Sequence, residues 1–327
     1  MHPHVASDNS DPTNTSCVMY NILMNCPICA GMTGIKPAGP YLDPIENKEY
    51  RKFRCMSCDI VFSDPMRNPG ANWYQLYDDR FGCKGRNDFV PGYQFSALAS
   101  VRQPDRAQKL LDLGCGYGSF LLQAKKMGFE AYGVDFDARR VEAAQKAGFE
   151  NVKACSVEDF YEQSKNSAEK FDVITFFQFL EHVENPGAFL LMISGMLSPG
   201  GIIMLEVPNN RRFLASISGP VDEPPHHLTR WSPAGLEKFL RDKGFETIKI
   251  KDDDCPLLVI YENIFFWFTT NTLAFIKRIF RAAPLPAAGN NAATGRPGAP
   301  APFCSTGTKD AIVKAAKRFF FALAVPL

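Results

Sequence analysis

The stretch Lys109–Gly118, KLLDLGCGYG, decides the fold of this chain. An apolar run leads into three glycines at alternate positions, Gly114, Gly116 and Gly118, and a helical pattern follows them. Glycine allows positive φ and close approach of the backbone to a ligand, and the N–H groups that open the next helix favour a negatively charged group. The stretch therefore predicts a nucleotide-type pocket in an α/β sheet.

The alternation of strands and helices continues on both sides of this turn. A helix is predicted over 119–128, with Gly128 as its C-terminal cap, and a second over Ala138–Ala147, closed by Gly148. Such alternation is typical of an α/β fold with a doubly wound, mostly parallel sheet. The other predicted strands are Glu130–Asp135, Val152–Ala154, Phe171–Phe177, Gly201–Val207 and Phe245–Lys251.

The compact GxGxG after Asp112 resembles the first motif of the class I S-adenosylmethionine (SAM)-dependent methyltransferases and differs from the longer GxGxxG of dinucleotide folds. Leu180–Val183, LEHV, and Ser198–Gly201, SPGG, resemble further segments of these enzymes. The resemblance implies a Rossmann-like, seven-stranded-type methyltransferase sheet. It also implies that Asp112 and the glycines hold the methionine end of SAM, that Asp135 holds the ribose, and that Val157 and Glu158 frame the adenine. The full set of implied SAM-binding residues is Asp112, Gly114, Cys115, Gly116, Gly118, Asp135, Phe136, Val157, Glu158, Gln178, Glu181 and His182.

The LEHV segment raises the question of a metal ion. Quinone O-methyltransferases have a similar segment with an additional acid three residues before the glutamate, an acid sometimes proposed to help bind a divalent ion. This chain has Gln178 at that position, which weakens a metal role for Glu181 and His182 alone. The alternative role for these two residues is a polar cap on the helix that follows.

Two CxxC pairs precede the glycine motif. Cys26 with Cys29 and Cys55 with Cys58 are separated by 25 residues, and four thiolates on two tight knuckles complete a tetrahedral zinc site. Paired disulfides are the alternative. The other six cysteines are scattered and the first twenty residues lack an apolar stretch, so we expect a reducing cytoplasm and structural Zn²⁺. A zinc ribbon before such a domain resembles methyltransferases of nucleotide-sugar and cell-surface glycan pathways, in which the ribbon helps to shape the substrate side; a folding unit or a protein-docking surface is the alternative.

Asp222–Pro233, DEPPHHLTRWSP, lies between the fifth predicted strand and the next helix. It resembles a PPHHLxxWS segment found in many small-molecule methyltransferases, where this loop faces the methyl-donor pocket. Histidine suits proton removal from a hydroxyl at neutral pH. The hypothesis is that one of His226 and His227 is the catalytic base and the other a structural hydrogen-bonding residue; the alternative is that both only hold the loop against the sheet.

Changes in composition along the chain predict how it is divided into segments. The last segment places basic residues beside aromatic ones, which suits the surface of an anionic membrane, with packing on the catalytic domain as the alternative. No antiparallel seventh strand is recognisable, and no clean apolar span long enough for a transmembrane helix occurs. The predicted segments are a disordered N-terminus (1–20), the zinc ribbon (21–64), an aromatic-rich helical lid or linker (65–106), the methyltransferase core (107–253), an apolar helical segment (254–281), a disordered linker (282–308) and an amphipathic C-terminal helix (309–327).

Charge and motif content limit the function. Lys and Arg total 36 against 35 Asp and Glu, a net charge of +1 that gives no electrostatic case for nucleic acid. The resemblance predicts a cytoplasmic enzyme, with the inner face of the membrane as a further location, that methylates a hydroxyl or carbon of a small-molecule, saccharide or lipid-linked acceptor. Its rivals are a non-catalytic SAM-binding or zinc-mediated interaction protein and an NAD-dependent oxidoreductase, which the absence of an evident Tyr-x-x-x-Lys pair disfavours.

Overall fold

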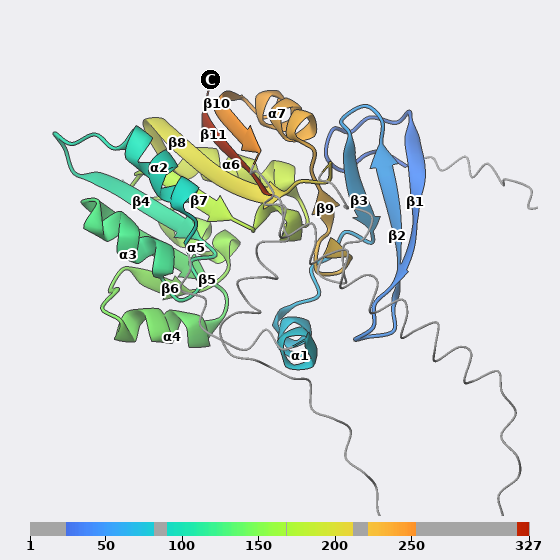
Figure 1. Cartoon of the computed structure of the whole chain (residues 1–327), viewed down its shortest axis with the longest axis horizontal. Coiled ribbons are helices and arrows are strands. Elements are labelled where there is room, and N and C mark those ends of the chain that lie inside the picture. Colours follow the sequence, from blue (N-terminus) through green and yellow to red (C-terminus); the bar gives the residue numbers. More distant parts are fainter. Residues whose placement is uncertain (1–23, 82–89, 168, 212–221, 253–318, 327) are drawn as a thin grey trace, which may run out of the picture.

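The computed structural model describes residues 24–81, 90–167, 169–211, 222–252 and 319–326. These residues form two sheets that lie beside one another, a seven-stranded sheet flanked by helices and a smaller four-stranded sheet (Figure 1). The larger sheet has the order β10-β11-β8-β7-β4-β5-β6. The α/β fold with a doubly wound, mostly parallel sheet that the sequence predicts is therefore confirmed.

Five adjacent strands of the larger sheet run parallel. The central ones carry buried apolar residues on both faces, as expected for strands covered on both sides. Because the strands are parallel, the turns that follow them meet at one edge of the sheet, the edge at which ligands bind in such folds. These strands are β4 (Gln108–Leu113), β5 (Phe129–Asp135), β6 (Val152–Ala154), β7 (Phe171–Phe177) and β8 (Leu197–Pro208).

The C-terminal residues supply the strand that the sequence did not reveal. β11 (Phe319–Pro326) inserts between β8 and β10 (Phe245–Asp252) and is antiparallel to both. The amphipathic helix predicted over 309–327 is thus wrong for 319–326. A short apolar run is compatible with either a helix or a buried strand, and here pairing with β8 and β10 makes it a strand. Residues 253–318 separate β11 from its neighbour β10, which hid the pairing from local sequence patterns.

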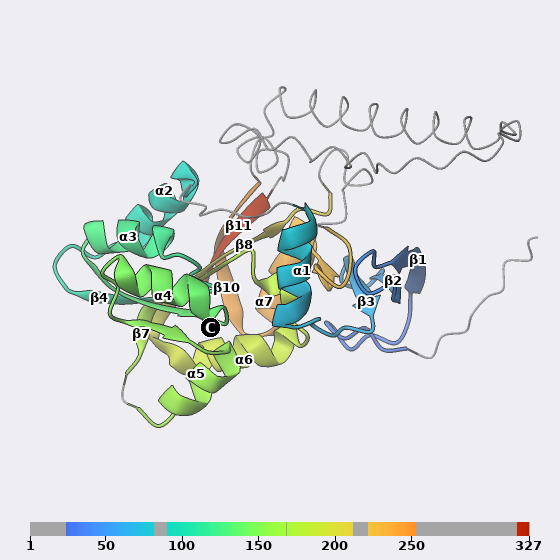
Figure 2. The ribbon, with the colours of Figure 1, turned by 90° about the horizontal axis from the view of Figure 1, so that it is seen from below.

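Helices cover both faces of this sheet (Figure 2). The alternation of side chains along β4 divides the core into two clusters. Leu110 faces the cluster shared with α2 (Gly92–Val101), α3 (Ser119–Lys126) and α4 (Ala138–Lys146). Leu111 faces the cluster shared with α5 (Val157–Ser164), α6 (Pro186–Met196) and α7 (Pro233–Asp242). Gly128 and Gly148 follow α3 and α4 at φ of 86° and 93°, as the predicted caps require.

The smaller sheet joins the cysteine-rich segment to the larger domain. Its order is β1-β2-β3-β9, with β1 (Ile35–Leu42), β2 (Glu49–Cys55) and β3 (Ile60–Asp64) followed by β9 (Thr229–Arg230), which comes from the loop before α7. A Cβ on Gly235 of α7 would lie 2.7 Å from the carbonyl oxygen of Cys58. Cys26, Cys55 and Cys58 also belong to the core cluster that contains Leu236 and Phe239 of α7. The two sheets therefore share one core.

Several predicted segments lie partly or wholly outside the described residues. The N-terminal segment 1–20, the apolar segment 254–281 and the linker 282–308 are among these. Segment 65–106 contains α1 (Ala71–Phe81) and α2, which confirms its helical character. In the described part of the chain, no helix is both long and apolar enough to span a membrane.

Candidate active site

The glycine turn lies at the end of β4, at the carboxyl edge of the parallel strands. Gly114, Gly116 and Gly118 have φ of 78°, 54° and 80°, values that side chains with a Cβ rarely adopt. A Cβ on Gly114 would lie 2.8 Å from the ring of Phe179, whereas nothing lies within 4 Å of a Cβ on Gly116. The turn is thus closed on the side of Phe179 and open at Gly116, where a ligand can approach the backbone.

Asp112 is buried near the end of β4, two residues before Gly114. Thr175 of β7 donates its hydroxyl hydrogen to Asp112 Oδ1 at 2.6 Å. Burial raises the pKa of Asp112 to about 7, and the neighbouring Asp135 carboxylate contributes in the same direction. A cationic group brought to this carboxylate would stabilise its charged form.

Asp135 ends β5 beside the same turn. Its two carboxylate oxygens accept hydrogen bonds of 2.9 Å from the backbone N–H groups of Gly116 and Asp137. Burial raises the pKa of this group as well. The side chain of Phe136, the next residue, is half exposed. The structure thus places Asp112, Asp135 and the glycine turn together, as the sequence predicts for the methionine and ribose ends of SAM.

The remaining predicted SAM-binding residues differ from one another in burial and in their contacts. Cys115 is buried, and burial raises the pKa of its thiol, so it packs as a small apolar group. Val157 is part of the hydrophobic core at the start of α5, whereas Glu158 is exposed. Gln178 follows β7 at φ of 53° and donates its side-chain amide to Glu206 Oε1 at 2.8 Å.

Glu206 is a site residue that sequence reasoning missed. It is a buried acid within the apolar strand β8, and its other carboxylate oxygen accepts hydrogen bonds from Tyr93 Oη at 2.6 Å and Gln94 Nε2 at 2.8 Å. It thereby ties α2 and the residue after β7 to the carboxyl edge of the sheet. A charged residue in an otherwise apolar strand is the signal that could have found it.

Three histidines gather next to this edge. His182 lies in the 3-10 turn Leu180–His182 after β7, and His226 and His227 come from the loop before β9. Their ring centroids are 4.7–5.0 Å apart. His227 is buried, with Nδ1 3.4 Å from Asp222 Oδ1, and Nε2 of both His182 and His227 lies 3.9 Å from Oε1 of the fully buried Glu181.

Helix α1 covers the histidines with aromatic side chains. Tyr77 stacks on the His226 ring at 4.9 Å, and Trp73 and Tyr74 pack around the same ring. Tyr74 also contacts Phe136 at 5.8 Å between ring centroids, which links the histidines to the residue after Asp135. The aromatic density of 65–106 therefore contributes both to packing and to the surroundings of the predicted catalytic residues.

The histidine loop is anchored to the small sheet. Leu228 accepts a hydrogen bond from the N–H of Ser63 on β3 and donates its own N–H to the carbonyl of Glu181. The Glu223 carboxylate forms 2.7 Å ion pairs with Lys52 on β2 and Arg230 on β9, all three being largely buried. The N–H of His227 donates to the Glu223 carbonyl. The position of the histidines thus depends on the fold of the small sheet.

The four cysteines converge at the base of the small sheet. Cys26 Sγ lies 3.7 Å from Cys58 Sγ, and Cys29 Sγ lies 3.7 Å from Cys55 Sγ; all four sulfur atoms are within 4.8 Å of one another. A tetrahedral ion with Zn–S bonds of about 2.3 Å places sulfurs about 3.8 Å apart, whereas a disulfide needs about 2.05 Å. All four are free thiols, so the donor set and its spacing fit a zinc ion.

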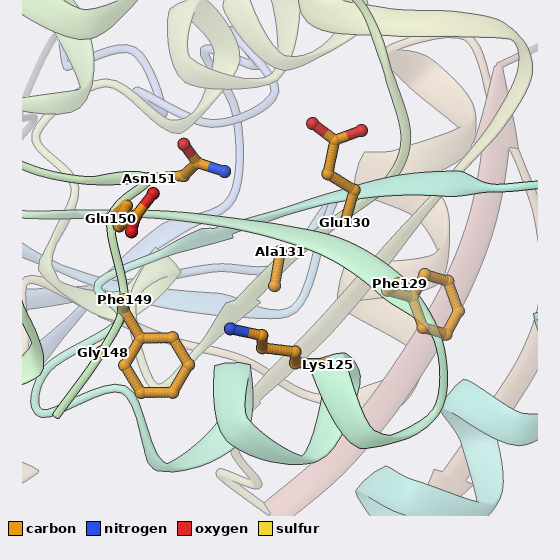
Figure 3. Close-up of a pocket in the computed structure, with 8 residues that line it drawn as sticks. All are labelled: Lys125, Phe129, Glu130, Ala131, Gly148, Phe149, Glu150 and Asn151. Atoms are coloured by element: carbon orange, nitrogen blue, oxygen red, sulfur yellow. The ribbon is translucent and has the colours of Figure 1, made fainter.

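A separate hollow of about 220 Å³ lies at the opposite edge of the sheet (Figure 3). It is lined by residues that precede or begin β5 and β6, including Lys125, Glu130 and Asn151. These strands start there, so the hollow lies at their amino ends, whereas Asp135 lies at the carboxyl end of β5. It plays no part in the site described above.

Comparison with known proteins agrees with this arrangement. Residues 89–250 match the family model described as a methyltransferase domain. This match covers the part of the chain in which the glycine motif resembles methyltransferases. The glycine turn, Asp112, Asp135 and the LEHV segment all lie within the matched residues, whereas the four cysteines lie before them.

Curated relatives match part of the chain. A ubiquinone biosynthesis O-methyltransferase from Actinobacillus pleuropneumoniae is 33% identical over 140 residues, which are 40% of this chain and 58% of that protein. One from Thiobacillus denitrificans is 24% identical over 176 residues, 49% of this chain and 76% of that protein. The chain thus spans about three fifths of the length of the first of these relatives. A SAM-dependent methyltransferase structure from Archaeoglobus fulgidus is 18% identical, with a TM-score of 0.48, over 77% of this chain and 99% of that one.

Proposed function

We propose that this chain transfers the methyl group of SAM to a hydroxyl group of a small-molecule acceptor. The observation that carries the proposal is the open glycine turn between Asp112 and Asp135, inside a methyltransferase domain. The curated relatives, named as ubiquinone biosynthesis O-methyltransferases, support a hydroxyl as the acceptor group. Transfer to carbon, and saccharide or lipid-linked acceptors, are finer alternatives within the same reaction class.

The proposed roles of the SAM-binding residues follow from charge and position. Bound SAM supplies an electrophilic methyl group on a cationic sulfonium. Asp112 and the backbone of Gly114, Gly116 and Gly118 would bind its amino-acid end, and Asp135 its ribose hydroxyls. Val157 and Glu158, at the start of α5, would border the adenine, with Phe136 beside it. Gln178, held by Glu206, would fix the backbone between the glycine turn and the histidines.

The histidine pair would serve the acceptor. His226 and His227 lie across the carboxyl edge from Asp135, linked to it through Tyr74 and Phe136. Methyl transfer needs the acceptor oxygen aligned with the methyl group and its proton removed. We assign both tasks to this cluster, with His227 fixed by Asp222 and His226 partly exposed beneath α1.

The four cysteines would hold a structural zinc ion. Their sulfur spacing fits a tetrahedral site, and the hydrogen bond from Cys58 lowers the pKa of Cys26, which favours the thiolate form that zinc binds. The ion would stabilise β1, β2 and β3 and, through β9, the histidine loop.

The activity is tested by incubating the zinc-loaded chain with methyl-labelled SAM and a panel of phenolic, saccharide and lipid-linked hydroxyl acceptors. The proposal predicts label in an ether product from at least one class, with stoichiometric release of S-adenosylhomocysteine. Catechol-type phenols are the first choice because the curated relatives act in ubiquinone biosynthesis by name. Tight SAM binding without transfer to any acceptor would favour a non-catalytic SAM-binding protein.

A further inference from the structure

We propose that one face of the small sheet binds a phosphoryl group carried by the acceptor. The inference deepens the proposed function and rests on it for the identity of the acceptor, whereas the binding of phosphate by this face does not depend on methyl transfer. We call the surface the basic face; its cations are Lys36 on β1, Lys52 and Arg54 on β2, Arg211 after β8 and Arg230 on β9.

The pairing of the strands collects these side chains on one side of the sheet. Arg54 and Arg230 both pair with the buried Val61 of β3, so the two arginines flank it in one row across the strands. Lys52 lies two residues before Arg54 and therefore on the same side. Phe53, between them, has the opposite orientation and belongs to the hydrophobic core. The cations thus occupy the side of the small sheet that faces away from the core.

One acid of the basic face serves two cations. Lys52 Nζ and Arg230 Nη2 both lie 2.7 Å from the same oxygen, Oε2 of Glu223. The three side chains together keep one positive charge, and none of them is more than 18% exposed. Because these cations are partly shielded from water and salt, they attract an incoming anion more strongly than fully exposed side chains do.

The same arrangement recurs beside Arg54. Asp59 pairs with Arg54 at 3.2 Å and with Arg211 at 2.7 Å, so it too is shared by two cations. The exposed Lys36 stands opposite Arg54 on β1. Counting these side chains with those around Glu223, five cations stand against two carboxylates. The basic face therefore has an excess of three positive charges.

A phosphoryl group fits this excess better than a carboxylate does. It carries a charge of about −1.5 to −2 at pH 7 and has three acceptor oxygens, whereas a carboxylate has one charge and two oxygens. Guanidinium groups bind phosphate through paired hydrogen bonds. The backbones of Arg54 and Arg230 are two strand spacings apart, about 10 Å, so both side chains can reach an anion placed over Val61.

The basic face is joined directly to the histidine loop. The carbonyl of Glu223 accepts the N–H of His227, while its carboxylate holds Lys52 and Arg230. An acceptor whose phosphoryl group lies on this face would extend to the histidine pair, to which we assign its hydroxyl. The basic face would then orient the acceptor without taking part in the chemistry.

The experiment titrates the zinc-loaded full-length chain with inorganic pyrophosphate in a calorimeter, at low ionic strength. S-adenosylhomocysteine is present throughout to occupy the glycine turn, and malonate is the carboxylate comparison. Pyrophosphate should bind at least about tenfold more tightly than malonate. Arg54→Gln should weaken pyrophosphate binding by about tenfold, and so should Arg211→Gln at the more exposed end of the Asp59 pairs. Arg51→Gln removes an exposed cation from the opposite side of β2 and should leave the affinity unchanged.

Three results would overturn the proposal: equal affinities for malonate and pyrophosphate, equal losses in the Arg51 and Arg54 variants, or no pyrophosphate binding by a chain that binds S-adenosylhomocysteine. A folded chain that fails to bind S-adenosylhomocysteine would instead contradict the proposed function. Flotation with phosphatidylcholine vesicles, with and without phosphatidic acid, separates a lipid headgroup from a free phosphate. Binding to phosphatidic acid vesicles without binding of pyrophosphate would assign the basic face to a membrane surface and would also overturn the proposal.

Discussion

Thr175 and Asp112 meet across β7 and β4, with the threonine hydroxyl donating to the aspartate carboxylate at 2.6 Å in the core of the sheet. The carboxylate that we assign to SAM binding is thus held in place by one hydrogen bond and destabilised by complete burial, which raises its pKa to about 7. The charged form of Asp112 would therefore favour SAM binding, but its burial lowers the stability of the fold.

This relationship predicts a pH dependence of stability. An acid whose pKa is raised by folding binds more protons in the folded state, so its contribution lowers the free energy of unfolding as pH rises from about 4 to about 7. For Asp112 the loss reaches up to about 4 kcal/mol. Asp112→Asn should flatten this part of the pH profile in urea unfolding and raise stability at pH 8, while weakening SAM binding. An unchanged pH profile in the variant would contradict the raised pKa.

The open glycine turn predicts that alanine substitutions at Gly116 and Gly200, two glycines with similar backbone conformations, differ in their effect on SAM binding. Gly116 and Gly200 both have positive φ, 54° and 73°, and nothing lies within 4 Å of a Cβ on either. Replacing either by alanine should therefore cost about 1–2 kcal/mol of stability. Only Gly116→Ala should also weaken SAM binding, by at least about tenfold, because its Cβ enters the proposed ligand space. Equal SAM affinity in the two variants would contradict the placement of SAM.

The anchoring of the histidine loop predicts an effect of the small sheet on catalysis. Lys52→Met removes one of the two cations that hold Glu223, so the loop carrying His226 and His227 should shift. We expect kcat to fall by about tenfold with the Kd for SAM unchanged, because small displacements of catalytic groups are costly. Lys238→Met, which removes an exposed ion pair with Asp242 on α7, is the matched control and should leave kcat unchanged.

The C-terminal strand predicts that the last residues of the chain are needed for the sheet. A chain ending at residue 318 would leave β8 and β10 without their shared partner and would lose the buried Ala324. Its thermal unfolding midpoint should fall by at least about 10 °C, or the protein should be recovered only unfolded. A chain ending at Pro326 keeps all of β11 and serves as the control. Equal midpoints for the two chains would show that β11 contributes little.

Local sequence patterns were enough to predict most strands of the larger sheet. The bounds predicted for β6 and β7 agree with the structure, and Gly114, Gly116 and Asp135 meet as the motif predicts. β11 could not be predicted, because its partner β8 lies more than a hundred residues earlier and nothing local marks the pairing. The cluster of His182 with His226 and His227 was equally out of reach of the sequence. Its two segments are brought together by the Leu228 to Glu181 hydrogen bond, a tertiary contact.

The central claim is that this fold binds SAM at the glycine turn. Calorimetric titration of the zinc-loaded full-length chain with SAM, S-adenosylhomocysteine and NAD in parallel tests it most directly. The account predicts micromolar binding of SAM and S-adenosylhomocysteine, lost in Gly116→Ala and kept in Gly200→Ala, with no heat from NAD. Binding of NAD alone, or the absence of SAM binding by the folded chain, would contradict it.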